Sequence, residues 1–301
     1  MGTGPSHPGD PLPRPAGWGH TYPVPTVLIT GASTGIGRAT ALRLAESGWT
    51  VLAGVRKARD GEELVAAGGE RVVPIILDVT DAAQIAKAAE RVAELTGMGA
   101  LDALVNNAGI GFGGPLELVP IDDLRSQFEV NVIGSVAITQ ALLPALRRAR
   151  GRIVFISSVG GRVPMAFTAP YAASKHAIEA IGDALRVELR SSNVQVALVE
   201  PGSVATPIWD KSRAQGDGLS VPAELTDQYG HVPAAMNKVL SDTELRGVPP
   251  EQVAETIARA LTARRMKARY LIGRDAKAML LAKRLLPDHV FDRMARRVLG
   301  V

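Results

Sequence analysis

The 301-residue sequence contains no cysteine, and only 4% of its residues are aromatic. The absence of cysteine excludes disulfide bonds, thiolate nucleophiles and cysteine-ligated metals, and it is typical of a reducing compartment, so we expect a cytoplasmic protein. The five histidines show no metal-ligand spacing, so metal chemistry is not expected. With 46% hydrophobic residues but few aromatics, the core must be largely aliphatic.

The sequence also lacks long hydrophobic runs and a signal pattern. No apolar stretch is expected to approach the roughly 18 residues that a membrane-spanning helix needs. Residues 1–24 are rich in Pro and Gly and lack the basic and then apolar segments of a signal peptide. We expect them to form a disordered leader.

Positive charge is concentrated at the C-terminal end. Between Arg259 and Val301, twelve Lys and Arg against three Asp and Glu give a charge of +9, whereas the whole chain carries +4. Residues 276–301 have a basic amphipathic helical pattern that permits peripheral contact with an anionic membrane, although docking on the protein's own domain is favoured. The tail lacks interleaved aromatics, so nucleic-acid binding is not expected.

Short β-branched segments alternate with helical patterns along residues 25–275. This alternation predicts an α/β fold: a single-domain, Rossmann-type, doubly wound parallel sheet of about seven strands with helices on both faces. Residues 203–248 interrupt the rhythm and are expected to form a lid inserted over the site. The expected strands are TVLIT (26–30), WTVLAGV (49–55), RVVPIIL (71–77), DALVNNA (102–108), GRIVFISS (151–158), VQVALVEPG (194–202) and RYLIG (269–273).

The segment TGASTGIG directly follows the first expected strand. Gly31, Gly35 and Gly37 allow a tight turn and a close approach of the backbone to a pyrophosphate. The start of the following helix, from about Ile36, would stabilise the phosphate charge through its free amides and its dipole. The segment therefore predicts a dinucleotide site.

The residues after the second expected strand indicate which dinucleotide is bound. An NAD site places a carboxylate there to bind the ribose 2′-hydroxyl, but no Asp or Glu lies between Ser47 and Arg59. Arg56 and Lys57 stand in its place. Because a guanidinium fork suits a 2′-phosphate, we expect NADP(H) rather than NAD(H).

Lys175 follows Tyr171 by four residues in the helical pattern YAASKHAIEAIGDAL. The two side chains should lie on one helix face, one above the other, so that the ammonium can act on the phenol. A solvated lysine beside a half-buried tyrosine would show the same spacing.

Taken in order, TGASTGIG, NNAG (106–109), ISS (156–158), YAASK (171–175) and PG (201–202) resemble the short-chain dehydrogenase/reductase family. The resemblance covers residues 25–275, and AGVRK and RYLIGRDAK are similar to sequences of its NADP-preferring steroid and retinoid branch. It implies an oxidoreductase that transfers a hydride between nicotinamide and a carbon bearing oxygen.

The resemblance also implies the catalytic residues. Tyr171 would be the acid/base, and Lys175 would stabilise its anion, lowering a pKa that is ordinarily ~10, and hold the nicotinamide ribose. Ser158 would hydrogen-bond the substrate oxygen; Ser157 is the alternative, since neighbouring strand residues point to opposite sides. Asn131 in VNVIG matches an asparagine that carries a water relay to the lysine, a role compatible with satisfying buried helix backbone.

Cofactor contacts are implied along the whole nucleotide. For Asp78, an N-cap of the following helix is the alternative role. The implied residues are Gly31, Ser33, Thr34, Gly35, Ile36, Gly37, Arg56, Asp78, Val79, Asn107, Ala108, Gly109, Tyr171, Lys175, Pro201, Gly202, Val204 and Thr206.

The candidate substrate pocket is mostly apolar. It favours a hydrophobic ketone, aldehyde or secondary alcohol, such as a steroid- or retinoid-like molecule, over a sugar or an acid. In the family, subunits pair through helices near 121–149 and 171–192, which implies a homodimer or homotetramer. The expected walls are Phe112, Val163, Met165, Phe167, Ile208, Trp209 and Tyr229.

Two other functions fit parts of the sequence. GASTG (31–35) matches the G-x-S-x-G elbow of hydrolases, with Ser33 as the nucleophile. However, that elbow normally follows several strands, and His176, His231 and His289 lie in no matching context. A non-catalytic NADP(H) sensor or scaffold would need the glycine loop but not the acid, so the complete catalytic set favours an enzyme.

Overall fold

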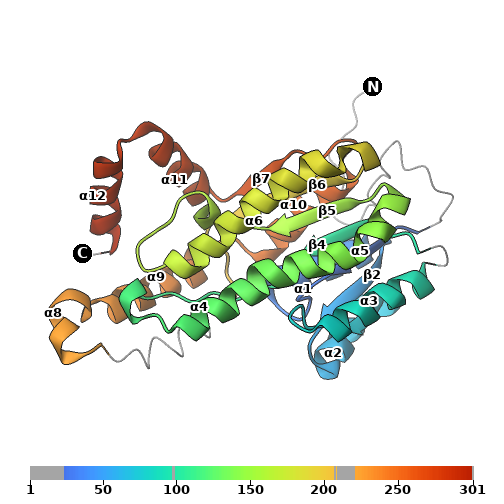
Figure 1. The fold of residues 1–301 in the computed structure, drawn as a ribbon, viewed down its shortest axis with the longest axis horizontal. Helices are drawn as coiled ribbons and strands as arrows, with labels where there is room; N and C mark the ends of the chain where they lie inside the picture. Colours follow the sequence, from blue (N-terminus) through green and yellow to red (C-terminus); the bar gives the residue numbers. More distant parts are fainter. Residues whose placement is uncertain (1–23, 97–98, 207, 209–220, 300–301) are drawn as a thin grey trace.

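The computed structural model of the protein describes residues 24–96, 99–206, 208 and 221–299 (Figure 1). Residues 1–23 of the expected leader and Trp209 therefore lie outside the described residues. Within them, seven parallel strands form one sheet in the order β3-β2-β1-β4-β5-β6-β7. The strands are β1 (Thr26–Ile29), β2 (Thr50–Val55), β3 (Val72–Ile76), β4 (Ala103–Asn106), β5 (Arg152–Ile156), β6 (Gln195–Pro201) and β7 (Arg269–Ile272).

All seven strands expected from the sequence are present, with ends shifted by up to two residues. The helices that connect and cover them are α1 (Gly35–Glu46), α2 (Ala58–Gly68), α3 (Ala82–Leu95), α4 (Ile121–Phe128), α5 (Ser135–Ala149), α6 (Ala169–Glu188), α8 (Thr226–Tyr229), α9 (Val232–Arg246), α10 (Pro250–Thr262), α11 (Arg274–Leu285) and α12 (Asp288–Leu299).

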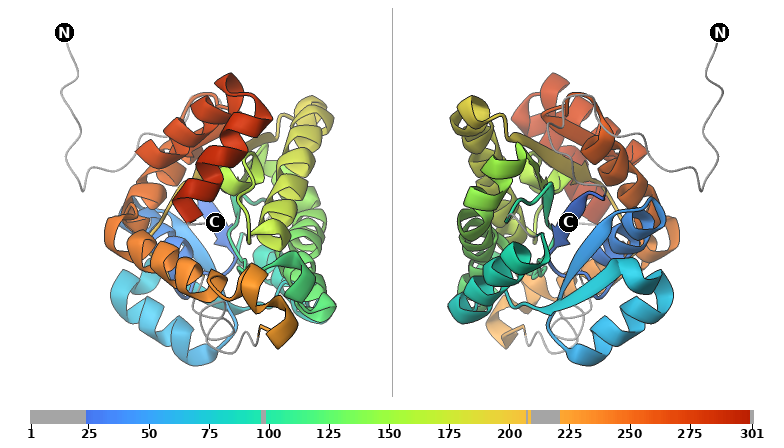
Figure 2. Two further views of the ribbon diagram at one scale, coloured as in Figure 1. Left: turned by 90° about the vertical axis from the view of Figure 1, so that its left-hand side faces the viewer. Right: turned by 90° about the vertical axis from the view of Figure 1, so that its right-hand side faces the viewer.

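Helices cover both faces of the sheet (Figure 2). Because side chains alternate along a strand, Val27 and Ile29 pack into one core cluster and Leu28 into the other. The first cluster includes residues of α1 and α10, and the second includes residues of α3, α5 and α6. The doubly wound α/β fold is thus confirmed.

The strand order reverses at β1. From β1 the chain moves outward to β2 and β3, then returns to place β4 on the other side of β1. In open parallel sheets this reversal leaves a crevice beyond the carboxyl ends of the two strands, where ligands bind. The glycine loop follows β1 directly and therefore lies at this crevice.

The helical stretch Ile121–Ala149 is long and apolar enough to cross a membrane by length and composition. The expectation that no such run exists was therefore wrong. Half of its apolar window is buried, because Ile138, Leu142 and Leu146 pack in the core beneath the sheet. Between α4 and α5 this stretch contains a π-helical segment, η3 (Glu129–Gly134).

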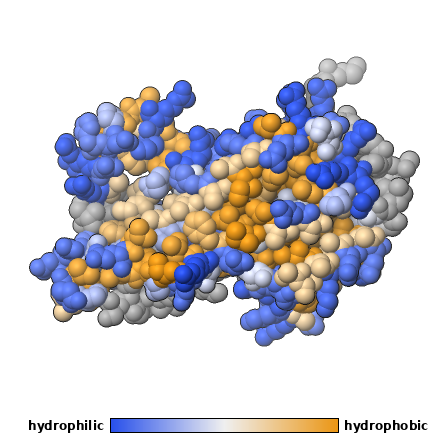
Figure 3. All heavy atoms as spheres, in the orientation of Figure 1, coloured by the Kyte–Doolittle hydropathy of each residue, from blue (hydrophilic) through white to orange (hydrophobic). Residues whose placement is uncertain are grey.

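The outer face of the helices near α4 to α6 carries an apolar surface band (Figure 3). Its exposed side chains include Ile121 of α4, Ile133 of η3 and Val187 of α6, which are 58%, 52% and 67% exposed. Both faces of this helical layer are thus apolar, the inner one toward the sheet and the outer one toward solvent.

A buried cluster of charged groups joins β7 and β6 to α6. Arg269 lies 2.6 Å from Asp183 Oδ2, 3.0 Å from Glu179 Oε2 and 2.9 Å from Glu200 Oε1. Burial and the neighbouring Glu179 raise the pKa of Glu200 to about 7, which Arg162 and Arg269 partly oppose. Arg269 therefore compensates two carboxylates that have little access to water.

We predict that Arg269→Met destabilises the protein by about 3–5 kcal/mol, because it leaves buried carboxylates without their cation. The control Arg125→Met breaks an exposed ion pair with Asp122 and should cost less than about 1 kcal/mol. Urea unfolding of both variants measures the difference. Equal losses of stability would show that Arg269 is no more than a surface charge.

A second prediction concerns pH. The pKa of Glu200 rises from 4.5 to about 7 on folding. The contribution of Glu200 to stability is therefore complete at pH values below its pKa in the unfolded chain, and it is lost as the pH rises through its pKa in the folded protein. Glu200→Gln removes this titration. The free energy of unfolding of this variant, minus that of the wild type, should therefore increase by about 2 kcal/mol from about pH 5 to about pH 8. Urea titrations across this range measure the difference. A difference that does not change with pH would contradict the raised pKa.

Candidate active site

A cavity of about 620 Å³ opens at the carboxyl ends of the central strands. Its walls come from the glycine loop after β1, the loops after β2, β3, β4, β5 and β6, the N-terminal part of α6, and helices α9 and α11. Most of the site residues expected from separate parts of the sequence thus line one cleft.

The glycine loop has the form of a phosphate cradle. Gly31 and Gly35 have φ values of +64° and +53°, which glycine adopts without strain. A Cβ at Gly37 would lie 2.3 Å from the Gly31 carbonyl oxygen, so only glycine fits there. Helix α1 starts at Gly35 with no acidic residue in its first turn and no side-chain cap from Thr34. Its first amides therefore remain suited to a pyrophosphate.

Two side chains brace this loop. The Asn107 amide donates hydrogen bonds of 2.9 and 3.0 Å to the carbonyls of Thr30 and Gly31. The Thr30 hydroxyl accepts from the backbone amides of Asn107 and Ala108, at 3.0 and 2.9 Å. Thr30 was not among the expected site residues, although it ends the segment TVLIT directly before the glycines.

Arg56 follows β2 and lines the cleft, whereas Lys57 is the N-cap residue of α2. Arg56 is exposed and makes no hydrogen bond or ion pair with any other described residue. Its guanidinium thus remains available to a ligand phosphate. Among the described residues that line the cleft, the carboxylates are those of Asp78 and Asp275, neither of which follows β2.

Asp78 and Val79 follow β3 and line the same end of the cleft. The N-cap of α3 is Asp81, whose carboxylate accepts from the amides of Ala83 and Gln84. The alternative role of Asp78 as a helix cap was therefore wrong. Asp78 accepts instead from the amide and hydroxyl of Thr80, which fixes the turn.

Tyr171 and Lys175 lie one turn apart on α6, with Lys175 Nζ 5.7 Å from the centre of the tyrosine ring. Lys175 is only 4% exposed, and its ammonium donates a 2.9 Å hydrogen bond to the carbonyl of Ile156 at the end of β5. The lysine is therefore not a solvated side chain. It is fixed between the phenol and the central sheet.

Burial governs the proton affinities of this pair. Desolvation raises the pKa of Tyr171 to about 12, which a hydrogen bond with Ser158 partly opposes. Desolvation also lowers the pKa of Lys175 to about 8, which Glu179 partly opposes. The pKa of the phenol is thus raised rather than lowered, because desolvation is the largest influence on it.

Ser158 and Ser157 are distinguished by their surroundings. A Cβ at Gly160 would lie 3.5 Å from Ser158 Oγ and 3.7 Å from Tyr171 Cε1, so these two groups flank the same point. Ser157 Oγ is buried without a hydrogen-bond partner among the described residues and lies close to Gly161. Of the two serines, Ser158 is the one that faces the phenol.

Asn131 lies in the π-helical segment η3 and is 1% exposed. Its side chain exchanges hydrogen bonds of 2.8 and 2.9 Å with the backbone of Ile110, and its amide donates to Ser174 Oγ at 3.0 Å. A Cβ at Gly109 would lie 3.3 Å from Asn131 Oδ1 and 3.7 Å from Lys175 Nζ. Asn131 therefore joins the loop after β4 to the helix that carries Lys175.

The loop after β6 brings Pro201, Gly202, Val204 and Thr206 to the cleft. It is held by Asp275 of α11, whose carboxylate accepts from the Ser203 amide at 2.8 Å. Sequence analysis missed Asp275, because nothing in RYLIGRDAK shows that its acid reaches back to this loop.

The substrate side of the cleft is largely apolar. Of the expected walls, Val163, Met165, Phe167 and Ile208 line it, whereas Phe112 and Tyr229 do not. Phe112 is buried elsewhere, and the Tyr229 hydroxyl hydrogen-bonds Glu117 at 3.0 Å. The structure adds residues that sequence analysis missed, four of them with the helical spacing of one face of α9: Met236, Val239, Leu240, Thr243 and Met279.

No histidine of the described residues lines the cleft, so Ser33 has no base for a hydrolase mechanism there. His176, one of the three candidates, instead contacts the carbonyl of Ala172 within α6 at 2.8 Å. Ser33 lines the phosphate end of the cleft, which fits its expected place at the nucleotide.

Comparison with known proteins agrees with this geometry. The short chain dehydrogenase family model matches residues 25–217. The chain is 37% identical over 272 residues to an NADPH-dependent 3-dehydrocapnine reductase of Ornithobacterium rhinotracheale, covering 89% of this chain and 94% of the relative. It is 35% identical over 279 residues to retinol dehydrogenase 5 of Mus musculus, covering 88% and 86%.

A solved structure is also similar. It is a short chain dehydrogenase from Burkholderia cenocepacia in complex with NADP, with a TM-score of 0.69 and 25% identity over 90% of this chain and 97% of that one. Together with the parallel sheet, the glycine loop and the Ser158–Tyr171–Lys175 arrangement, these matches show that the chain belongs to the short-chain dehydrogenase/reductase family, oxidoreductases that act on CH–OH and C=O groups.

Proposed function

We propose that the protein transfers a hydride between NADP(H) and a hydrophobic ketone, aldehyde or secondary alcohol. The observation that carries the proposal is that Ser158 and Tyr171 line the same cavity as the glycine loop and the apolar walls, with Lys175 Nζ 5.7 Å from the centre of the tyrosine ring. When bound, the dinucleotide supplies the hydride chemistry, while the protein supplies alignment and the proton.

The three side chains have separate roles in this proposal. Tyr171 exchanges the proton with the substrate oxygen, and a pKa of about 12 keeps the phenol protonated and ready to donate to a carbonyl. Ser158 donates a hydrogen bond to the same oxygen. Lys175, whose pKa of about 8 keeps it mainly charged at neutral pH, stabilises the negative charge left on the phenol.

Arg56 supports NADP(H) over NAD(H). It lies at the end of β2, where a ribose 2′-substituent is read in this fold, and it has no competing partner among the described residues. The name of the first relative states that it depends on NADPH, and the similar solved structure holds NADP.

The apolar walls support a hydrophobic substrate. Val163, Met165 and Phe167 reach the cleft from the segment before α6, and Met236 and Leu240 reach it from α9. No Lys or Arg other than Arg56 lines the cleft among the described residues, and the Lys175 ammonium is buried against the Ile156 carbonyl, so a carboxylate substrate would find no exposed cation at the apolar walls. The named retinol dehydrogenase relative acts on an apolar alcohol, which agrees with this choice.

We also propose a homo-oligomer that pairs through the apolar surface band. Ile121, Ile133 and Val187 are exposed on helices that are otherwise packed on the sheet. Contiguous apolar surface of this kind marks interaction sites in soluble domains. A second copy would cover the band without obstructing the cleft, which lies at the carboxyl ends of the strands.

Tyr171→Phe tests the catalytic proposal. It removes the exchangeable proton but keeps the ring, so kcat for carbonyl reduction should fall by roughly 10²–10⁴-fold while NADPH affinity changes little. Steady-state kinetics and fluorescence titration with NADPH measure the two quantities. Substantial residual turnover would exclude Tyr171 as the acid.

The two neighbouring serines provide a matched control. Ser158→Ala should lower kcat by roughly 10²-fold, because it removes the hydrogen bond to the substrate oxygen. Ser157→Ala removes a hydroxyl without a partner among the described residues and should leave kcat within about twofold of the wild type. The reverse result would assign the substrate contact to Ser157.

Arg56→Asp tests the cofactor proposal. It replaces a phosphate-binding fork with a carboxylate, so Kd for NADPH should rise by at least about tenfold while Kd for NADH is unchanged or lower. Arg59→Asp is the control, since Arg59 is exposed, pairs with Glu63 and lies outside the cleft. If Arg56→Asp leaves the preference unchanged, the 2′-phosphate is recognised elsewhere.

A further inference from the structure

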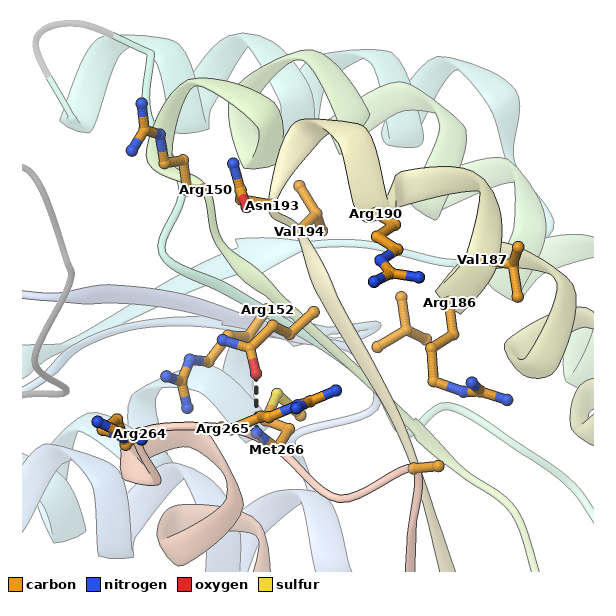
Figure 4. Close-up of a pocket in the computed structure, with 13 residues that line it drawn as sticks. Arg150, Arg152, Arg186, Val187, Arg190, Asn193, Val194, Arg264, Arg265 and Met266 are labelled. Carbon is orange, nitrogen blue, oxygen red and sulfur yellow. Dashed lines mark hydrogen bonds between the residues drawn. The ribbon is translucent and has the colours of Figure 1, made fainter.

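Six arginines surround a second cavity, of about 620 Å³, at the end of the sheet opposite to the active site (Figure 4). Its walls come from the turns that precede β5 and β6, the C-terminal part of α6 and the segment between α10 and β7. No Asp or Glu of the described residues lines it. The arginines are Arg150, Arg152, Arg186, Arg190, Arg264 and Arg265.

These arginines reach the cavity from different elements. Figure 4 shows Arg186 and Arg190 on the α6 side and Arg264 and Arg265 on the other side. Arg152, the first residue of β5, is 1% exposed, and its guanidinium donates a 2.9 Å hydrogen bond to the carbonyl of Ala260. Burial lowers the pKa of Arg152 to about 10, which shows that its charge is held against a desolvation cost.

Helix ends explain part of this charge but not all of it. The C-terminal ends of α5, α6 and α10 meet here, and each contributes roughly half a negative charge that favours nearby cations. Asp183 adds one full negative charge, through a 2.8 Å ion pair with Arg186. Against six guanidiniums this leaves an excess of roughly three and a half positive charges.

The excess charge lies on side chains that are otherwise unused. Arg150, Arg190, Arg264 and Arg265 are exposed and form no ion pair with any residue in the described part of the chain. Several like charges around one concave site repel one another when it is empty, and an anion removes that repulsion. The arrangement therefore favours a ligand that carries more than one negative charge.

We propose that this arginine pocket binds a nucleotide-sized molecule that carries several phosphate groups. Guanidinium forks match phosphate oxygens in pairs, and the cavity volume is that of a small-molecule site. Val187 and Val194 on the α6 side and Met266 on the other side add apolar surface against which a base or sugar can pack. Because the site is concave, it suits a small polyanion better than a flat membrane surface.

The pocket is separate from the active site. Arg152 begins β5, and Ser158 follows the other end of that strand, so the five residues of β5 alone place roughly 17 Å between the two sites. The proposal thus does not depend on the proposed hydride transfer and can be tested without an activity assay.

Calorimetric titration with sodium tripolyphosphate and with ATP tests the proposal on the full-length protein. Both probes should bind saturably at one site, and Arg190→Glu with Arg265→Glu should weaken binding by at least about tenfold. The control pair Arg293→Glu with Arg296→Glu changes the net charge equally on exposed positions of α12, and it should change Kd by less than about twofold. If ATP binds and tripolyphosphate does not, the pocket recognises the base as well as the phosphates.

Four results would overturn the proposal. The first is the absence of saturable binding, and the second is an equal loss in both double variants, which would show general attraction of anions. The third is a loss caused only by Arg56→Asp, which would place the probes in the dinucleotide cleft. Fourth, if Arg190→Glu with Arg265→Glu lowers Tm and leaves binding intact, the arginines serve only the helix ends.

Discussion

The active site depends on the close packing of α6 against the carboxyl ends of β5 and β6, which buries Lys175 beside the Ile156 carbonyl. Glycines permit this approach: a Cβ at Gly161 would lie 3.0 Å from the Lys175 carbonyl oxygen, and one at Gly182 would lie 3.0 Å from Leu198. Without these two glycines α6 would lie farther from the sheet, and the ammonium of Lys175 would be hydrated. Desolvation is the largest influence on the pKa values of both Tyr171 and Lys175.

A charged group buried in this way needs compensation, and the same helix provides it. Glu179 lies one turn beyond Lys175 and opposes the lowering of its pKa. Glu179 in turn needs a cation of its own, which Arg269 supplies from β7 together with the ion pair to Glu200. The residue after Glu200 is Pro201 of the cleft, so a single electrostatic cluster adjoins both Lys175 and the loop after β6. Buried ion pairs are weak sources of net stability, and this one is better understood as a means of positioning α6.

The sequence predicted the strands and the glycine loop well, because both have local causes: β-branched runs between helical periods, and glycines directly after the first strand. Tyr171, Lys175 and Ser158 were found through spacing and family resemblance, and the structure brings them together. The raised pKa of Tyr171 could not be predicted, since desolvation depends on how the folded chain packs around the phenol. Asp275 and Thr30 were missed for a related reason, because their hydrogen bonds reach loops distant in sequence. By contrast, Met236, Val239, Leu240 and Thr243 carried a readable helical period, which the polar composition of residues 203–248 concealed.

The parallel sheet itself explains why both candidate binding sites lie at its two ends. Strands such as β1 and β5 are buried on both faces, so the side chains along their length are committed to the core. At the carboxyl ends the following helices present their amino termini, and free amides favour the phosphates of a dinucleotide. At the amino ends the preceding helices present carbonyls, which favour the arginines that lie at or just after the ends of α5, α6 and α10. In this arrangement the backbone amides attract anions at the carboxyl ends of the strands, and arginine side chains do so at the amino ends. The amino ends need several guanidiniums because the helix carboxyl termini there carry partial negative charge that repels an anion.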